Sequence, residues 1–168
     1  MNKTAEILIN KLNLSKHPEG GWFREVYRSE EIIKKNDLPE RFNGDRCFST
    51  SIYYLLEGKT FSAFHKIKSD ETWHFYFGSS LTLIIIDESS KLNEIQIGND
   101  FENNEYFQYT VLQNCWFAAV LNDQNSFALV GCTVSPGFDF NDYELGEKDI
   151  LIKQMPQHKS LFEKFCIH

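Results

Sequence analysis

The strongest constraint on the fold is a series of short strand-like runs between Phe48 and Val134. Each run is rich in β-branched and aromatic residues, and Gly, Asn, Asp or Ser separate one run from the next. No helical stretch lies between them, which disfavours a parallel sheet because its crossovers are usually helices. Eight runs predict an antiparallel sandwich or barrel. They are residues 48–56, 62–67, 73–77, 81–87, 92–97, 106–112, 116–120 and 128–134.

The ends of the chain differ from this central region. Residues 4–14 have the apolar spacing of an amphipathic helix, with Thr4 as its expected N-cap. A further strand is expected over residues 22–29. Ser160 and Glu163 have the spacing of a capping box, which predicts a short terminal helix. The fold class is therefore all-β with small helical additions, in a single domain over residues 1–168.

Composition excludes several classes of function. The chain of 168 residues has 17 Lys and Arg against 24 Asp and Glu, and its formal charge of −7 argues against binding to nucleic acid. The four cysteines form no Cys-x-x-Cys pair. The N-terminus lacks the apolar core of a signal peptide, and the longest aliphatic run, residues 83–86, is too short for a bilayer. We expect a cytoplasmic protein that does not bind membranes.

The densest group of chemically active side chains lies in residues 64–78. A turn at Ser69-Asp70 places two strands side by side, so that His65 and Glu71 face the same interior. Strand alternation directs Trp73, Phe75 and Phe77 to the face of Glu71 and His74 to the other. An imidazole beside a carboxylate binds a divalent metal or acts as a general base. The same pattern is also compatible with a histidine that only packs in the core.

Two later segments also allow two interpretations. Residues 116–119 are suited to line a ligand cavity or to fill an aromatic core. Residues 132–140 carry two Phe side chains after a Pro-Gly turn, and they suit either a lid over a pocket or a cover for a sheet edge. The chain contains no phosphate-binding glycine loop and no Gly-x-Ser-x-Gly motif.

Five segments in this order resemble the small cupin-like proteins known as domain of unknown function 985, or cupin 5. The resemblance extends over most of the chain, and five ordered segments are a more specific signal than any one of them. The segments are residues 17–25, 49–56, 64–78, 116–119 and 130–140.

The resemblance implies a double-stranded β-helix, or jelly roll, of the cupin type over residues 22–145. An N-terminal helix over residues 1–16 and a short C-terminal helix over residues 157–168 flank it. It also implies a homodimer and kinship with dTDP-sugar 3,5-epimerases and seed storage proteins. It implies no settled reaction.

The resemblance also bears on metal binding. Metal-binding cupins have a His-x-His pair, then Glu, then Gly, and a further His in a second motif. Here Glu71 and Gly78 keep the spacing, but Ala63 replaces the first His and Phe117 the last. Phe offers no lone pair, so no cofactor is predicted. If a divalent metal binds, its expected ligands are His65, Glu71 and His74.

The leading hypothesis is a barrel that binds a small polar metabolite, such as a sugar or nucleotide-sugar, and isomerises or epimerises it without a metal. His65 is the expected general base and Glu71 tunes or orients it. In the related epimerases a tyrosine is the acid, for which Tyr53 and Tyr76 are candidates only by their proximity in sequence. The alternatives are a non-catalytic binding module, a metal-dependent cupin enzyme and a structural dimer with a filled barrel. The residues expected to line the ligand pocket are Arg46, Ser49, Tyr53, His74 and Trp116.

Overall fold

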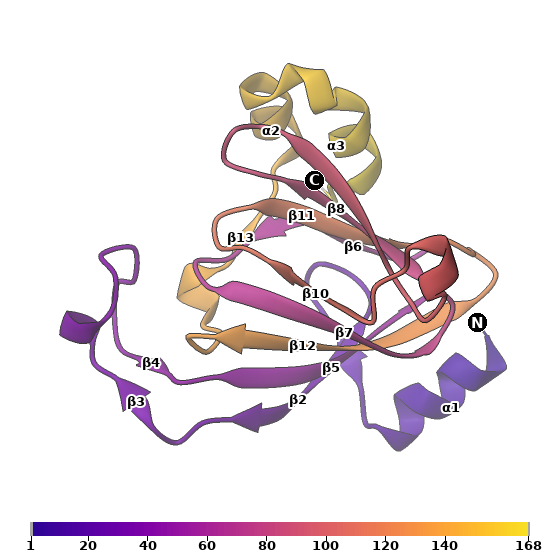
Figure 1. The fold of residues 1–168 in the computed structure, drawn as a ribbon, viewed down its shortest axis with the longest axis horizontal. Helices are drawn as coiled ribbons and strands as arrows, with labels where there is room; N and C mark the ends of the chain where they lie inside the picture. Colours follow the sequence, from indigo (N-terminus) through magenta and orange to yellow (C-terminus); the bar gives the residue numbers. More distant parts are fainter. Residues whose placement is uncertain (1, 168) are drawn as a thin grey trace.

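Two antiparallel sheets pack face to face in the computed structural model, which describes residues 2–167 (Figure 1). This confirms the predicted all-β jelly roll with small helical additions. The six-stranded sheet has the order β1 (Ser15–Lys16), β2 (Trp22–Arg28), β5 (Thr50–Glu57), β12 (Phe127–Ser135), β7 (Asp70–Gly78) and β10 (Gln108–Val111). The five-stranded sheet has the order β13 (Glu144–Leu145), β6 (Phe61–Lys66), β11 (Trp116–Leu121), β8 (Leu81–Ile86) and β9 (Leu92–Ile97), while β3 (Ile32–Ile33) pairs with β4 (Arg46–Cys47).

The core between the sheets follows from strand alternation. Every second residue of a strand faces the opposite sheet, and these positions hold large apolar side chains. Burial of each such side chain stabilises the fold by about 1.5–3 kcal/mol. At one end of the barrel the same inward positions hold His65 and Glu71 instead. The core side chains include Tyr54, Trp73, Leu83, Phe117 and Val130.

Helix α1 (Lys3–Lys11) packs on the outer face of the six-stranded sheet (Figure 1). Asn2, rather than the predicted Thr4, is its N-cap, because the Asn2 side chain accepts hydrogen bonds from the first turn. The helix ends at Lys11 instead of reaching residue 16, since Asn13 adopts a left-handed conformation (φ 52°) before β1 begins.

Two C-terminal helices, α2 (Lys148–Gln154) and α3 (Lys159–Phe165), cover the outer face of the five-stranded sheet (Figure 1). The sequence predicted only the second of them, over residues 157–168. Residues 1 and 168, at the ends of the two predicted helical segments, lie outside the described residues. The short 3₁₀ turns are η1 (Lys35–Asp37), η2 (Phe101–Asn103), η3 (Phe140–Asp142) and η4 (Pro156–His158).

No helix within residues 2–167 is both long enough and apolar enough to cross a membrane.

A β-bulge at Tyr76 changes the face of the last residues of β7. Phe75 pairs with Val130 and Phe77 with Leu129, so Tyr76 is the extra residue between them. Phe75 therefore packs with the core, whereas Phe77 lies on the outer face beside Phe127. The expectation that Phe77 shares the face of Glu71 was wrong, because simple alternation does not anticipate a bulge.

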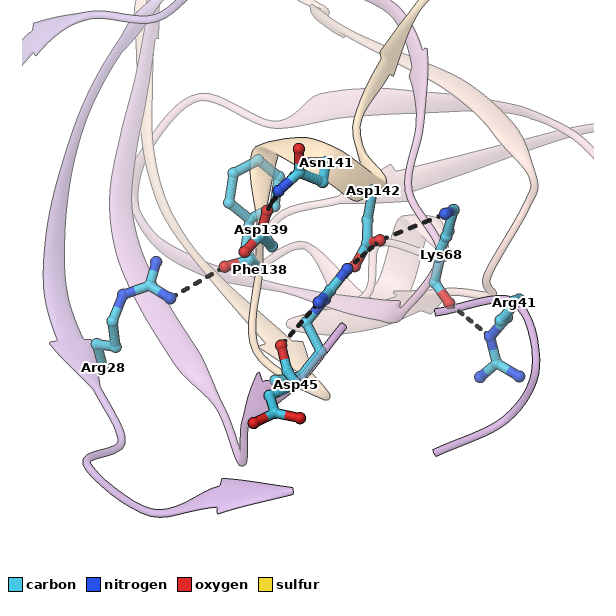
Figure 2. Close-up of polar contacts among 9 residues, drawn as sticks. Arg28, Arg41, Asp45, Lys68, Phe138, Asp139, Asn141 and Asp142 are labelled. Atoms are coloured by element: carbon cyan, nitrogen blue, oxygen red, sulfur yellow. Dashed lines mark hydrogen bonds and ion pairs between the residues drawn. The ribbon is translucent and has the colours of Figure 1, made fainter. Parts of the chain in front are cut away.

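The segment from residue 136 to residue 143 links β12 to β13 and covers one end of the barrel. A buried ion pair fixes it, because Arg46 donates two hydrogen bonds of 2.6 Å to Asp142. Lys68 Nζ lies 3.5 Å from Asp142, and Arg28 donates to the carbonyl oxygen of Phe138 at 3.0 Å. Figure 2 shows these contacts, with Asp142 facing Lys68 and Arg28 reaching Phe138. We refer to residues 136–143 as the strap.

Replacement of Asp142 by Asn should destabilise the protein by about 3–5 kcal/mol, because the buried Arg46 guanidinium would lose its counter-charge. Urea unfolding followed by tryptophan fluorescence measures this free energy. Glu163→Gln is the control, since it removes an exposed helix pair with Lys159 and should cost less than about 0.5 kcal/mol. Equal stability losses in the two variants would contradict a structural role for the Asp142 pair.

A buried acid–base cavity in the barrel

A cavity of about 90 Å³ opens between the two sheets beneath the strap. Its wall combines apolar side chains with a small set of titratable groups, which is the usual character of a small-molecule site. The apolar part is Phe23, Ile52, Ile67, Val134, Phe138 and Phe140, and the polar part is His17, Glu19, Glu25, Arg28, Thr50, His65, Glu71, Cys132 and Tyr143.

His65 lies on β6 and points into this cavity. Its ring packs against Phe117 of β11 with the ring centroids 4.1 Å apart, and only 3% of its side chain is exposed. Burial lowers the pKa of His65 to about 4, so the imidazole is neutral at pH 7. The Nδ1 atom lies 2.8 Å from the carbonyl oxygen of Ala63. A carbonyl only accepts, so Nδ1 carries the proton and Nε2 has the lone pair.

Glu19 is the carboxyl partner of His65, rather than the expected Glu71. Glu19 Oε2 lies 3.3 Å from His65 Nε2, and Ser62 donates a hydrogen bond of 2.7 Å to Glu19 Oε1. Burial raises the pKa of Glu19. The lone pair of His65 Nε2 and the lone pairs of Glu19 Oε2 would repel each other at this distance, unless a proton lies between the two atoms. Glu19 and His65 therefore share one proton.

The loop of residues 17–21 carries Glu19 to His65 because it presses directly on β6. The Ala63 N–H donates to the Glu19 carbonyl at 2.9 Å, and the Tyr54 hydroxyl donates to the Gly20 carbonyl at 2.7 Å. Gly20 has a φ of +111°, and a Cβ there would lie only 2.2 Å from the carbonyl oxygen of Phe61. Only glycine permits this approach.

Glu71 lies on β7 and faces the same cavity, as the alternation predicted. The residue is 7% exposed, and no cation within residues 2–167 pairs with its carboxyl. Burial, with a smaller contribution from the charge of Glu19, raises the pKa of Glu71 to about 8. The side chain is thus a neutral carboxylic acid at pH 7. It shares the cavity with His65, although it is not the group that holds the imidazole.

Tyr143, at the end of the strap, is the tyrosine of the cavity. Its ring stacks on His65 at a centroid distance of 5.6 Å and an interplanar angle of 30°. The hydroxyl is buried, and no residue of the described chain forms a hydrogen bond with it. Burial raises the pKa of Tyr143, so the hydroxyl keeps its proton. Tyr53 and Tyr76, suggested by sequence proximity, pack against each other outside the barrel with centroids 6.1 Å apart.

Tyr53, His74 and Trp116, which were expected in the pocket, lie elsewhere. Tyr53 is on the outer face of β5, beside α1. His74 lies on the face of β7 opposite Glu71, where its Nε2 is 3.2 Å from the hydroxyl of Thr133. Trp116 packs beneath α2 and α3 on the outer face of β11. Alternation directs these side chains away from the cavity, and the expectation that they line it was wrong.

Arg46 and Ser49 serve the structure of the strap and the strands instead of the cavity wall. Arg46 is 4% exposed and is fully occupied by its ion pair with Asp142 and by the carbonyl oxygen of Asp45. The Ser49 hydroxyl donates to the carbonyl oxygen of Val134 at 3.2 Å. Neither side chain lines the cavity, so both predictions of ligand contact were wrong.

The cavity brings together only two of the three conditional metal ligands, His65 and Glu71. His74 points away from Glu71, so the three conditional ligands His65, Glu71 and His74 do not converge. Phe117 covers one side of the His65 ring with a phenyl group, which is not a ligand. Within residues 2–167, no cluster of three or more His, Cys, Asp or Glu side chains has the arrangement of a metal site.

Three members of this site, namely His17, Glu19 and Tyr143, were not predicted from the sequence. His17 and Glu19 flank Pro18 before two glycines, and a Gly-Gly pair is a signal for close backbone approach. Tyr143 follows the aromatic segment that was considered as a lid. The sequence does not reveal that the loop of residues 17–21 and the strap both contact His65.

Comparison with known proteins places this architecture in a family. The family model Cupin_5, described as Cupin superfamily (DUF985), matches residues 6–146. The uncharacterized protein YML079W of Saccharomyces cerevisiae is 30% identical over 145 residues, which cover 81% of this chain and 72% of that protein.

Solved structures agree with this match. The protein SO0799 of Shewanella oneidensis has a TM-score of 0.87 and 38% identity, with 96% of each chain covered. A hypothetical protein from Leishmania major has a TM-score of 0.88 and 34% identity, covering 98% of this chain and 99% of that one. Oxalate decarboxylase of Bacillus subtilis shares the fold alone, at 14% identity and a TM-score of 0.54 over 89% of this chain and 36% of that one. The chain belongs to the Cupin_5 (DUF985) family of the cupin superfamily.

Proposed function

We propose that the barrel cavity binds a small polar metabolite and transfers a proton next to a carbonyl group, as a metal-independent isomerase or epimerase does. One observation carries this proposal. The pKa of Glu71 is raised to about 8 and that of His65 is lowered to about 4, and both groups line one cavity. Between these values the carboxyl keeps its proton and the imidazole lacks one. An acid and a base therefore coexist at neutral pH.

The geometry suits enolisation of a carbonyl compound. The protonated Glu71 carboxyl and the Tyr143 hydroxyl act as donors to the carbonyl oxygen. The Glu19–His65 pair is the base. The Glu19 carboxyl turns the shared proton away from His65 Nε2, and the lone pair of that nitrogen then removes the proton from the adjacent carbon. As the C–H bond breaks, its electron pair forms the enol, and Glu71 supplies the proton to oxygen. Return of a proton to carbon from the same or the opposite face gives the isomer or the epimer.

The size of the cavity limits how the ligand binds. Its volume of about 90 Å³ is well below the roughly 300–1,000 Å³ of a site that encloses a drug-sized ligand. A sugar or nucleotide-sugar would place its reacting carbonyl inside and leave the remainder at the mouth, beside Arg28 and Glu25. These two side chains form an ion pair of 2.7 Å there.

Exchange of substrate protons tests the reaction. Incubation of the protein in D₂O with a panel of small hydroxy-ketones and keto-sugars should incorporate deuterium next to the carbonyl group, as followed by proton NMR. His65→Ala should slow the exchange at least about 100-fold, because the general base is lost. His74→Ala, on the outer face of the sheet, is the matched control and should leave the rate unchanged. Binding of a panel member without exchange would favour a non-catalytic binding module.

The pH dependence of stability tests the protonation state of Glu71. Its pKa rises from 4.5 to about 8 on folding, so between these values the folded state holds a proton that the unfolded state releases. Stability should therefore fall as pH rises toward 8, by up to about 1.4 kcal/mol per pH unit from this group. Urea unfolding between pH 6.5 and 8 avoids the window below 6.5 in which His65 contributes the opposite slope.

Glu71→Gln should remove this part of the slope and make the variant more stable than the wild type near pH 8. Glu94→Gln is the control, because Glu94 is exposed on β9 and its replacement should leave the slope intact. A wild-type slope unchanged in Glu71→Gln would show that the carboxyl is ionised at pH 7 and would remove the proposed acid.

We also propose that the protein is a homodimer joined through the outer face of the six-stranded sheet. Three large side chains remain exposed on this face, namely Tyr27, Tyr76 and Phe77. Phe77→Lys should shift the species seen by sedimentation velocity from dimer to monomer. Phe101→Lys, at an exposed position on η2, is the control and should leave a dimer. A monomeric wild type would refute the assembly.

A further inference from the structure

His17 lines the cavity, but the proposed reaction assigns it no role. Its side chain is only 9% exposed, and its ring lies edge-on to Phe23 with centroids 4.6 Å apart. Nδ1 faces Glu19, at 3.4 Å from the backbone nitrogen and 3.5 Å from Oε2. The other nitrogen, Nε2, forms no hydrogen bond with any residue between 2 and 167.

The neighbouring contacts decide which nitrogen of His17 carries the proton. His65 Nδ1–H donates to Ala63, so the proton shared with Glu19 lies on the line from Glu19 Oε2 to His65 Nε2. Glu19 Oε1 already accepts from Ser62. His17 Nδ1 is then free to accept the backbone N–H of Glu19. In a neutral ring, an accepting Nδ1 leaves the proton on Nε2. In this arrangement, every hydrogen-bonding group shared among His17, Glu19 and His65 has a partner except the Nε2–H of His17.

A second unsatisfied donor lies beside the first. The Tyr143 hydroxyl is buried without a partner, and its ring centroid is 6.4 Å from that of His17. Buried polar hydrogens nearly always have an acceptor, in the protein or in what it binds. The buried Tyr143 hydroxyl therefore calls for an oxygen acceptor that the protein does not supply, and His17 on the same cavity wall offers a second N–H without a protein partner.

We propose that His17 Nε2–H and the Tyr143 hydroxyl together bind an anionic oxygen of the ligand, such as a carboxylate oxygen or the oxygen of an enolate. The inference rests on the proposed function for the location of the site, and it adds the chemical class of the ligand. Preorganised neutral donors in an apolar cavity stabilise negative charge on oxygen more strongly than water does, because they need no reorientation. An amide or hydroxyl of the same size gains less from the same two donors.

Acetate and acetamide are the probes, because they have the same shape and differ in charge. We expect acetate, titrated at pH 6.5 into ¹⁵N-labelled protein, to shift the amide resonances of the cavity and the His17 Nε2 resonance. Acetamide should bind at least tenfold more weakly. In the free protein, the imidazole nitrogen shifts of His17 should report a protonated Nε2. Equal binding of the two probes, or a protonated Nδ1 in neutral His17, would overturn the proposal.

Variants assign the effect to the two donors. His17→Phe keeps the edge-on packing but removes the N–H, and it should weaken acetate binding at least tenfold. His74→Phe is the matched control on the outer face and should bind acetate as the wild type does. Tyr143→Phe removes only a hydroxyl and should also weaken acetate at least tenfold, which keeps the test decisive if His17→Phe fails to fold. Wild-type affinity in a folded His17→Phe or Tyr143→Phe would refute the donor pair.

The acetate-binding test and the deuterium-exchange test can fail independently of each other. Deuterium exchange without selective acetate binding would refute the anionic oxygen site and leave proton transfer standing. Selective acetate binding that requires His17 and Tyr143, without exchange in any panel compound, would support the oxygen site and refute the reaction.

Discussion

The burial of two carboxyls and two imidazoles in one apolar cavity is the constraint on which the chemistry of this protein depends. Desolvation disfavours every charged form, so it raises the pKa of Glu19 and Glu71 and lowers that of His17 and His65. A nearby cation would reverse the effect on the carboxyls, but Arg28 at the mouth is engaged with Glu25 and Phe138. Neutral donors and acceptors are the result, in place of ion pairs.

Two irregular segments create this environment, and each has its own anchor. The loop of residues 17–21 depends on glycines that allow its backbone to touch β6. The strap depends on the Arg46–Asp142 ion pair, which is buried and therefore useful for fixing one geometry more than for adding net stability. Tyr143 follows Asp142 directly in the chain, so the ion pair determines where the tyrosine ring lies over His65. Arg46 thus shapes the site from outside it.

The sequence predicted the regular part of the structure because alternation and turn residues are local signals. The strands and the inward direction of His65 and Glu71 follow from a period of two. The same alternation directs His74 outward, against the expectation that it lines the pocket. The bulge at Tyr76, the strap anchor and the contact between Glu19 and His65 do not. They arise from residues distant in the chain that meet only after folding. Arg46 was expected to line the pocket, yet its guanidinium pairs with a carboxylate almost a hundred residues away.

Phe117 connects the fold to the chemistry. Its phenyl ring occupies the position where the family resemblance would place a metal-binding histidine, and it packs on His65 at 4.1 Å. The phenyl group removes a ligand and, at the same time, excludes water from the imidazole. Exclusion of water keeps His65 neutral and favours the proton shared with Glu19. The apolar side chain at this position therefore contributes to the desolvation that lowers the pKa of His65.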